Sequence, residues 1–293
     1  MNRTEQIKTA FAVNSLFKIQ VLFLWDLIFS LIVKPKTNTW HANKAKMGLW
    51  LLMPWRKTPF CIFNLKGNKK LKFAAFSSLP LVDCPGAGKC KSFCYSLKAW
   101  RFPAAFFRQL QNSFLQRYLW YRIEAAFLAL PQNVTLRLFV DGDFRNLQNL
   151  RQWMDLIRKR PDVKVYGYSK SWKEFVQLDN FGKYAWPENY LVNASSGSRH
   201  ENTGIANAFK SLSVCRGSFE AVQVSKHWMQ SGAYQGKDKP GNLGYRKEIR
   251  EAFKNIGQKV FACPGTCNNC MSDGKHACGS QAMSGVTIAI GIH

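Results

Sequence analysis

Hydrophobic residues in the central part of the chain follow two alternating spacings. Short apolar runs of strand length alternate with longer segments in which apolar residues recur at helical spacing. The runs predict strands at 134–140, 163–168, 190–194 and 221–224. The longer segments predict helices at 147–159, 172–178, 204–212 and 246–253. Because strands that alternate with helices form parallel βαβ units, we expect an α/β fold whose repeated βα units form a partial or closed parallel barrel.

Further elements flank this repeat. Residues 73–82 form an extended apolar run, and residues 67–70 before it have the composition of a hairpin turn. Apolar residues near helical spacing predict one long helix over 103–130, which Pro131 ends. Residues 231–248 are rich in Gly and Lys and predict an exposed loop.

The pattern divides the chain into three parts. Residues 1–45 are a peripheral apolar extension, residues 46–260 are the α/β domain, and residues 261–293 are a cysteine-rich segment that we expect to bind metal. Within the extension, the apolar run 17–33 is short for a membrane span and carries Asp26 near its middle. These features predict a buried or interfacial helix and argue against a membrane-spanning one.

Polar residues follow three of the predicted strands, at the points where the strands end. These stretches are Asp141-Gly142-Asp143, Ser169-Lys170-Ser171 and Ser195-Ser196-Gly197-Ser198-Arg199. Ligands of parallel α/β folds gather at the carboxyl ends of the strands. We therefore expect the three stretches to converge on one site.

Several of these residues suit particular roles. Asp141 and Asp143 are two positions apart, so on a strand they would face the same side and could bind a cation or an amine, or act as a base. One of them could instead cap the next helix. Lys170 could hold a carboxylate or a phosphate, with a plain surface role as the alternative. Residues that could form an anion-binding loop, rather than an ordinary polar loop, are Ser195, Ser196 and Arg199. We select Asp143 and Lys170 as candidate catalytic residues.

Three cysteines lie in the loop that follows the apolar run 73–82. They are Cys84, Cys90 and Cys94, with the spacing C-x5-C-x3-C. Pro and Gly residues in the first gap let the backbone turn tightly, which would bring the three sulfurs toward one point. Four sulfurs would close a tetrahedral metal site, whereas three leave one coordination position open. The loop therefore predicts a metal or cluster site with room for chemistry.

A second group of cysteines occurs in the segment 261–293. Its members are Cys263, Cys267, Cys270 and Cys278, with the spacing C-x3-C-x2-C-x7-C. Four thiols so spaced predict a closed metal site, which structural zinc and a fully ligated iron–sulfur cluster would both satisfy. His276 could replace Cys278, but we favour the thiol because four sulfurs suit both metals. The remaining cysteines, Cys61 and Cys215, have no close cysteine neighbours and are expected in the core.

Charge and cysteine content narrow the classes of function. The 293 residues include 42 Lys and Arg against 17 Asp and Glu, which gives a net charge of +25. Such an excess attracts polyanions, which are DNA, RNA or an anionic membrane surface, and of these DNA or RNA is the expected partner. Nine cysteines, most of them at ligand-like spacings, fit reduced thiols in the cytoplasm better than the disulfides of a secreted protein. The sequence has no Walker loop, Gly-x-Ser-x-Gly elbow or His-Glu-x-x-His motif, which argues against P-loop enzymes and common hydrolases.

Together the motifs resemble those of a known family. The stretches SLPLVDCPGAGKCKSFCY, LFVDGDF and VYGYSKS, followed by the second cysteine group, are similar to the phage gene product 88 domain family, which phages and plasmids carry. The resemblance covers roughly residues 60–280, and the cysteine loop is its most specific part.

The layout also resembles that of radical-SAM enzymes. In those enzymes a three-cysteine loop after the first strand holds a [4Fe–4S] cluster, and the remaining iron binds S-adenosylmethionine. An aromatic residue precedes their last cysteine, as Phe93 precedes Cys94 here, and a glycine–acid pair after the second strand contacts the cofactor's amino group, as Gly142-Asp143 could do. The spacing differs, because those enzymes usually have C-x3-C-x2-C, which occurs here in the second cysteine group.

These observations lead to three hypotheses. In the first, the protein is an iron–sulfur enzyme of a mobile element with radical-SAM-like chemistry, whose substrate is best sought among nucleic acids. The resemblance then implies a [4Fe–4S] cluster at the first cysteine group, with S-adenosylmethionine as a second cofactor, while the second group holds another cluster or zinc. In the second, it is a non-catalytic, zinc-stabilised DNA- or RNA-binding protein. In the third, both cysteine groups surround one structural metal site.

Overall fold

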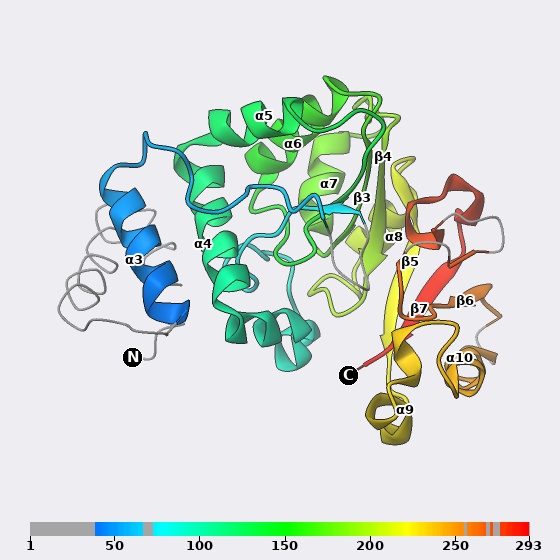
Figure 1. Cartoon of the computed structure of the whole chain (residues 1–293). Helices are drawn as coiled ribbons and strands as arrows, with labels where there is room; N and C mark the ends of the chain where they lie inside the picture. The colour runs from blue at the N-terminus through cyan, green and yellow to red at the C-terminus, as the bar shows by residue number, and fades with distance from the viewer. Residues whose placement is uncertain (1–38, 67–72, 255–256, 268–269, 272–275, 293) are drawn as a thin grey trace.

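A sheet of seven strands, all parallel, organises the residues that the structure describes (Figure 1). The structure is a computed structural model. It describes residues 39–66, 73–254, 257–267, 270–271 and 276–292. The predicted apolar helix at 17–33 and the predicted turn at 67–70 lie outside these ranges.

The strands are arranged in the order β1-β2-β3-β4-β5-β7-β6. Their bounds are β1 Ala74–Ala75, β2 Thr135–Leu138, β3 Lys164–Ser169, β4 Tyr190–Ser195, β5 Cys215–Val222, β6 Val260–Ala262 and β7 Thr287–Gly291. The predicted α/β class and the parallel βα repeat are confirmed. The closed-barrel form of the prediction is wrong, because β1 and β6 end the strand order and do not pair with each other, so the sheet stays open.

Helices connect the strands, and their bounds differ from the predicted ones in two places. The α-helices are α3 Thr39–Leu52, α4 Pro103–Tyr118, α5 Trp120–Leu128, α6 Leu147–Arg158, α7 Trp172–Asp179, α8 Gly204–Lys210, α9 Lys226–Gln230 and α10 Asn242–Glu251. The predicted helix 103–130 is divided at Leu119, whose φ of −139° and ψ of 49° are not helical. The predicted loop 231–248 is helical from Asn242 onward, where α10 begins.

One face of the sheet carries the main hydrophobic core, because alternate side chains of a strand point to opposite faces. Leu136 of β2, Val165 of β3 and Val192 of β4 belong to this core, together with apolar residues of α4, α6, α7 and α8. In Figure 1 the helices α4 to α7 lie on that side of the sheet. Trp153 of α6 is fully buried there, and its ring centroid lies 4.9 Å from that of Phe76.

The other face of the sheet is covered by the cysteine-rich segment. Tyr166 of β3, Phe219 of β5 and Ile288 of β7 pack with Ala277 and Cys278. The same segment contributes β7, which is inserted between β5 and β6. Residues 261–293 therefore complete the sheet as well as covering it.

At the other end of the described chain, α3 packs on α4. The ring centroid of Trp40 lies 5.5 Å from that of Phe106 and 5.6 Å from that of Phe107. The helix thus crosses the boundary that was predicted at residue 45.

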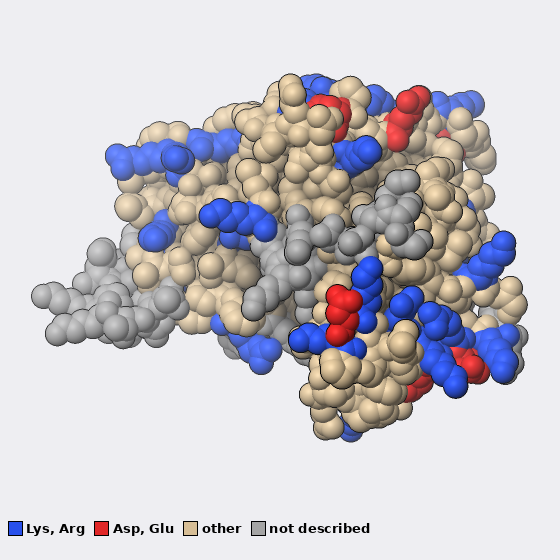
Figure 2. Space-filling model, turned by 45° about the vertical axis from the view of Figure 1, so that its right-hand side comes forward, with Lys and Arg blue, Asp and Glu red and all other residues tan. Residues whose placement is uncertain are grey.

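Basic side chains are spread over the surface that Figure 2 shows, and Lys and Arg outnumber Asp and Glu on it. This distribution agrees with the net charge of +25. Within the described ranges, no helix combines the length and the apolar character that crossing a membrane would require.

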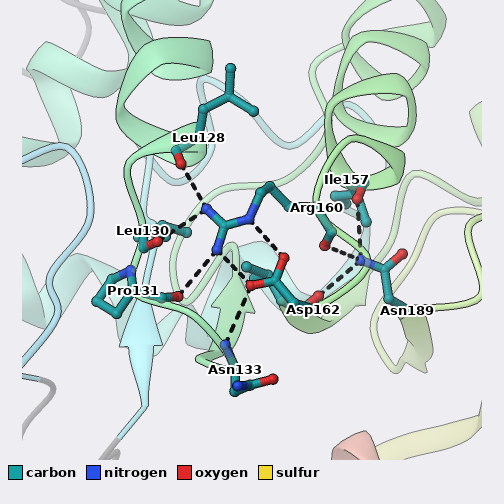
Figure 3. Close-up of polar contacts among 9 residues, drawn as sticks. Leu128, Leu130, Pro131, Asn133, Ile157, Arg160, Asp162 and Asn189 are labelled. Atoms are coloured by element: carbon teal, nitrogen blue, oxygen red, sulfur yellow. Dashed lines mark hydrogen bonds and ion pairs between the residues drawn. The ribbon is translucent and has the colours of Figure 1, made fainter.

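A polar network holds the amino ends of the central strands (Figure 3). Arg160 donates to both carboxylate oxygens of Asp162 at 2.6 and 2.7 Å, which lowers the pKa of Asp162 to about 2. Arg160 also donates to the carbonyls of Leu128 and Leu130 at 2.7 and 3.0 Å. The side-chain nitrogen of Asn189 lies within hydrogen-bonding distance of the carbonyls of Ile157, Arg160 and Val163. The carboxyl ends of the same strands form the opposite edge of the sheet.

Candidate functional site

The first cysteine loop, residues 84–94, pairs with the loop that follows β4. The backbone N–H groups of Gly88 and Cys90 donate to the carbonyl of Gly197 at 2.9 and 3.3 Å. The backbone N–H of Arg199 donates to the carbonyl of Gly86 at 2.9 Å. Two loops that lie about a hundred residues apart in the sequence thus form one surface at the carboxyl edge of the sheet.

The same cysteine loop contacts the end of β3. Ser198 Oγ lies 3.2 Å from the carbonyl oxygens of both Gly86 and Lys170, and so joins the three loops. Gly86 has to be glycine, because a Cβ atom there would lie 1.6 Å from the carbonyl oxygen of Lys170. The predicted convergence of the strand ends is confirmed.

Cys84 and Cys90 lie in the field of the same two charged residues. Burial raises the pKa of Cys84 well above its ordinary value, Asp143 raises it further and Lys170 opposes the rise. Burial also raises the pKa of Cys90, and Lys170 again opposes the rise while the nearby Cys94 adds to it. Besides Lys170, backbone hydrogen bonds lower the two pKa values, from Leu81 at Cys84 and from Gly88 at Cys90, and a bound cation would favour the thiolates further.

Asp143 joins the ends of β2 and β3. Its carboxylate is 3% exposed and accepts hydrogen bonds from Ser169 Oγ at 2.8 Å and from the backbone N–H groups of Lys170 and Phe144 at 2.7 and 2.8 Å. Burial raises the pKa of Asp143 to about 6, although these hydrogen bonds oppose the rise. Asp143 thus links the segments that follow β2 and β3, and its pKa of about 6 is well above that of an ordinary Asp.

The prediction that Asp141 and Asp143 face the same side is wrong. β2 ends before Asp141, and left-handed backbone at Phe139 (φ 55°) and Gly142 (φ 81°) turns the chain around it. The Asp141 carboxylate accepts a hydrogen bond from Gln109 Nε2 of α4 at 3.0 Å. The two carboxylates therefore bind to different elements, whereas alternation on a strand would have aligned them.

The three candidate anion-binding residues lie in different surroundings. Lys170 Nζ donates to Ser195 Oγ at 2.7 Å, so this pair lies together at the site. Ser196 Oγ accepts a hydrogen bond from the backbone N–H of Ala221 in β5 at 3.0 Å, and the side chain of Arg199 is exposed. Lys170 and Ser195 are thus positioned next to the cysteines, while Arg199 borders the site from the surface.

The second cysteine group surrounds one small pocket on the face of the sheet opposite the main core. The residues that line it are Tyr166, Phe261, Cys263, Thr266, Cys267, Cys270, His276, Ala277, Cys278 and Ile288. The backbone N–H of Gly265 donates to the sulfur of Cys263 at 3.4 Å, and that of Ala277 to the sulfur of Cys270 at 3.3 Å. Hydrogen bonds from the backbone to sulfur are typical of metal-bound thiolates, whose negative charge they stabilise.

His276 also lines this pocket. Its ring centroid lies 4.5 Å from that of Phe73 and 4.7 Å from that of Tyr166. Burial lowers the pKa of His276 to about 4, so the imidazole is neutral at physiological pH. Its Nδ1 atom is buried without a hydrogen-bond partner among the described residues. The imidazole thus stays an alternative ligand to Cys278.

All nine cysteines lie within the described residues, and none of them forms a disulfide. In those residues no group of three or more His, Cys, Asp or Glu side chains is arranged so that it could hold a single metal ion. Ligands of one ion have to meet at a single point, whereas the cysteines of a cubane cluster bind separate irons and stand farther apart. The metal or cluster that each cysteine group would bind therefore stays a prediction.

The two groups form separate sites, because the pocket of the second group contains no member of the first. The geometry therefore gives no support to one metal site shared by both groups. Of the two isolated cysteines expected in the core, Cys215 is half-buried and Cys61 is exposed, so the prediction for Cys61 is wrong.

Arg137, which the sequence did not single out, interacts electrostatically with Tyr95, the neighbour of Cys94 in the sequence, and with Cys267 of the second group. Its guanidinium lies 4.6 Å from the ring centroid of Tyr168. Burial lowers the pKa of Arg137, but Tyr168, Tyr95, Tyr166 and Cys267 together raise it by more. Side chains alternate between the two faces of the sheet along β2 (TLRL), so Arg137 lies on the face opposite Leu136. This alternation in the sequence could have identified a positively charged residue on the face that the cysteine-rich segment covers.

Comparison with known proteins gives one match. The model of a family described as gene product 88 matches residues 36–276, a range that includes every candidate metal ligand except Cys278. No curated protein and no solved structure matches the chain.

Proposed function

The chain belongs to the gene product 88 family, and from this premise we propose that it is an iron–sulfur enzyme with radical-SAM-like chemistry. In this proposal Cys84, Cys90 and Cys94 hold a [4Fe–4S] cluster with one iron left open. The second cysteine group holds another cluster or zinc. When bound, the open cluster would supply an electron for the reductive cleavage of S-adenosylmethionine, the electron coming from an external low-potential reductant.

One observation carries the proposal. The three-cysteine loop is attached by backbone hydrogen bonds to the loops that follow β3 and β4, at the carboxyl edge of a parallel sheet. A loop held on both sides keeps its thiols in one place before any ligand binds, which lowers the entropy cost of binding. The loop itself contains three cysteines and no fourth, which supports a site that is open on one side.

The chain's own residues would supply the surroundings of such a cluster. Lys170 places an ammonium near Cys84 and Cys90, where it offsets the negative charge of the thiolates and could bind a carboxylate or phosphate. Ser195 accepts a hydrogen bond from Lys170 and fixes the position of its ammonium. Asp143 holds the backbone of Lys170 and, with a pKa of about 6, could take up or release a proton.

The test is anaerobic purification of the full chain, followed by measurement of iron, sulfide and zinc, the visible absorption spectrum and binding of S-adenosylmethionine by equilibrium dialysis. The proposal expects a brown protein that binds the cofactor. A variant with Cys84→Ser, Cys90→Ser and Cys94→Ser should lose one cluster and the cofactor binding. The matched control with Cys61→Ser and Cys215→Ser removes two cysteines outside both groups and should keep both properties. A colourless protein that contains zinc alone would overturn the proposal.

The net charge of +25 favours a second candidate function, a zinc-stabilised protein that binds DNA or RNA without catalysis. The hydrogen bonds from Gly265 and Ala277 to cysteine sulfurs suit zinc as well as iron. This alternative expects stoichiometric zinc, no visible absorption and salt-dependent binding to nucleic acid. It expects the Cys84, Cys90 and Cys94 variant to keep its metal at the second group.

A further inference from the structure

Exposed aromatic and basic side chains border the first cysteine group. Phe93, Tyr95 and Phe102 are 38%, 50% and 63% exposed, and two of them directly flank Cys94. Lys89 and Lys91 precede Phe93 in the same stretch and are exposed as well. We call this surface the rim and define it as Lys89, Lys91, Phe93, Tyr95, Phe102 and Arg199.

The fold holds the rim in place. Residues Lys89–Phe93 and Tyr95–Arg101 form two consecutive 3₁₀-helices, and Phe102 lies at the start of α4. The hydroxyl of Tyr95 donates to the carbonyl of Val140 at 3.1 Å, so half of this residue is exposed while its hydroxyl end is fixed to the segment that follows β2. The backbone hydrogen bond from Arg199 to Gly86 attaches the other side of the rim.

The rim combines two features that suit one class of ligand. Residues 89–102 contain four basic residues and no acidic one. Partly exposed rings offer a face on which an unpaired base can stack, and the neighbouring Lys89 and Lys91 can contact phosphates. A duplex hides its base faces, whereas a single strand presents them, so the pairing of rings with lysines favours a single strand.

We propose that the rim binds single-stranded nucleic acid, with bases stacked on Phe93 and Phe102 and with the backbone phosphates on Lys89, Lys91 and Arg199. This inference rests on the proposed function in one respect. The bound single strand of nucleic acid would be the substrate of the chemistry at the first cysteine group. An anionic membrane is the other surface that lysines and aromatic residues could contact. Rings that keep about half of their surface covered suit stacking better than insertion into lipid.

The experiment measures fluorescence anisotropy of a labelled single-stranded oligonucleotide of mixed sequence with the anaerobically purified full chain. A blunt duplex of the same sequence and vesicles that contain phosphatidylserine serve as competing probes. The test variants are Phe102→Ala, the conservative Phe102→Trp, and the double variant Lys91→Ala with Phe93→Ala. The matched control is Phe181→Ala with Lys183→Ala, which removes an exposed aromatic residue and an exposed lysine before β4, away from the rim.

The proposal expects Phe102→Ala to weaken binding of the single strand by about tenfold, and Phe102→Trp to restore it, because one base loses and regains its stacking partner. The double variant should weaken binding further and reduce the slope of log Kd against log salt by about 0.7, since one phosphate contact is lost. The control variant should bind as the wild type does.

Three results would overturn the inference: equal effects of the test and control variants, duplex binding as tight as single-strand binding, or binding to the vesicles without binding to the oligonucleotide. Iron content is measured on every sample, so the two proposals can fail separately. Rim-dependent binding by a protein without iron would reject the proposed function and keep the inference. An iron-loaded protein that binds no single strand through the rim would reject the inference alone.

Discussion

Asn193 Oδ1 accepts a hydrogen bond from Arg216 Nε at 2.6 Å, on the face of the sheet that carries the second cysteine group. The side-chain nitrogen of Asn193 donates to the carbonyl of Cys278 at 2.9 Å. Arg216 donates to the carbonyls of Met283 and Val286, each at 2.7 Å. Through this pair, β4 and β5 hold the cysteine-rich segment at its last cysteine, Cys278, and just after it, at Met283 and Val286.

We expect Asn193→Ala to destabilise the protein by about 2–4 kcal/mol, because it leaves Arg216 Nε and the Cys278 carbonyl buried without partners. It should also speed the loss of metal from the second cysteine group to a chelator. Urea unfolding and the rate of metal release measure the two effects.

Asn189→Ala is the matched control, because Asn189 also places its amide nitrogen among three backbone carbonyls, but at the amino edge of the sheet. This variant should lower stability while leaving the rate of metal release under native conditions unchanged. Equal metal-release rates for the two variants would contradict the anchoring role of Asn193.

Gly197 determines the position of Cys90. Its φ is 82°, and a Cβ atom there would lie 2.6 Å from the Cβ of Cys90. Gly197→Ala should therefore cost about 1–2 kcal/mol for the left-handed backbone, with a further cost as Cys90 is displaced. We expect the variant to lose metal from the first cysteine group, as measured by metal content after anaerobic purification.

Gly182→Ala is the matched control for the clash with Cys90. Gly182 has a similar φ of 78°, but no atom lies within 4 Å of the added Cβ. It should show the backbone cost alone and keep all of its metal. If Gly197→Ala behaved in the same way, the close contact with Cys90 would have no consequence for the site.

Asp143 should make stability depend on pH between about 4 and 6. Burial raises its pKa from an ordinary 3.8 to about 6, so the folded protein holds this proton more tightly than the unfolded chain does. The contribution to stability is therefore complete below pH 3.8 and is lost as the pH rises through about 6, a change of about 3 kcal/mol.

Asp143→Asn removes this titration, so stability measured by urea unfolding should fall less between pH 4 and pH 6 in the variant than in the wild type. At neutral pH the variant should also be less stable than the wild type. The side-chain N–H₂ of the new Asn would face one of the N–H or O–H groups that donate to the Asp143 carboxylate. Parallel stability curves for the two proteins would show that Asp143 is ionised throughout this range.

A buried ion pair stabilises the residue that precedes the first cysteine. Arg117 Nη2 lies 2.6 Å from Asp83 Oδ1, with side chains that are 5% and 0% exposed, and Ser113 Oγ donates to Asp83 Oδ2 at 2.5 Å. Arg117→Met should cost about 3–5 kcal/mol in urea unfolding, because it leaves the carboxylate buried without its counter-charge. Adding Asp83→Asn should recover a large part of this loss, and a failure to recover would mean that the cost is one of packing.

Much of the fold was readable from local pattern. The positions of β2, β3, β4, α6, α7 and α8 were predicted to within a few residues. Such elements are set by spacing and by Gly, Pro and polar residues over a few neighbouring positions, and these signals lie within the segment itself. The same reasoning placed Lys170 and Ser195 at strand ends, where the structure brings them within 2.7 Å.

Other features had no local signal. The run 73–82 contains only the two-residue strand β1, and β5 begins at Cys215 rather than at the predicted residue 221. The separation of Asp141 from Asp143 depends on the φ of 55° at Phe139, a conformation that a phenylalanine seldom adopts without tertiary support. Pattern alone therefore placed the strand at 73–82 too long, β5 too short, and Asp141 and Asp143 on one regular strand.

The sequence by itself determined the α/β class, the parallel repeat and the two groups of cysteines, because periodicity and spacing are properties of short segments. Only the tertiary structure decided that the sheet stays open, that β7 lies between β5 and β6, and that Arg137 interacts with both Tyr95 and Cys267. These outcomes depend on which faces are buried against each other across the whole chain, and the free energy of that burial is not contained in any one segment.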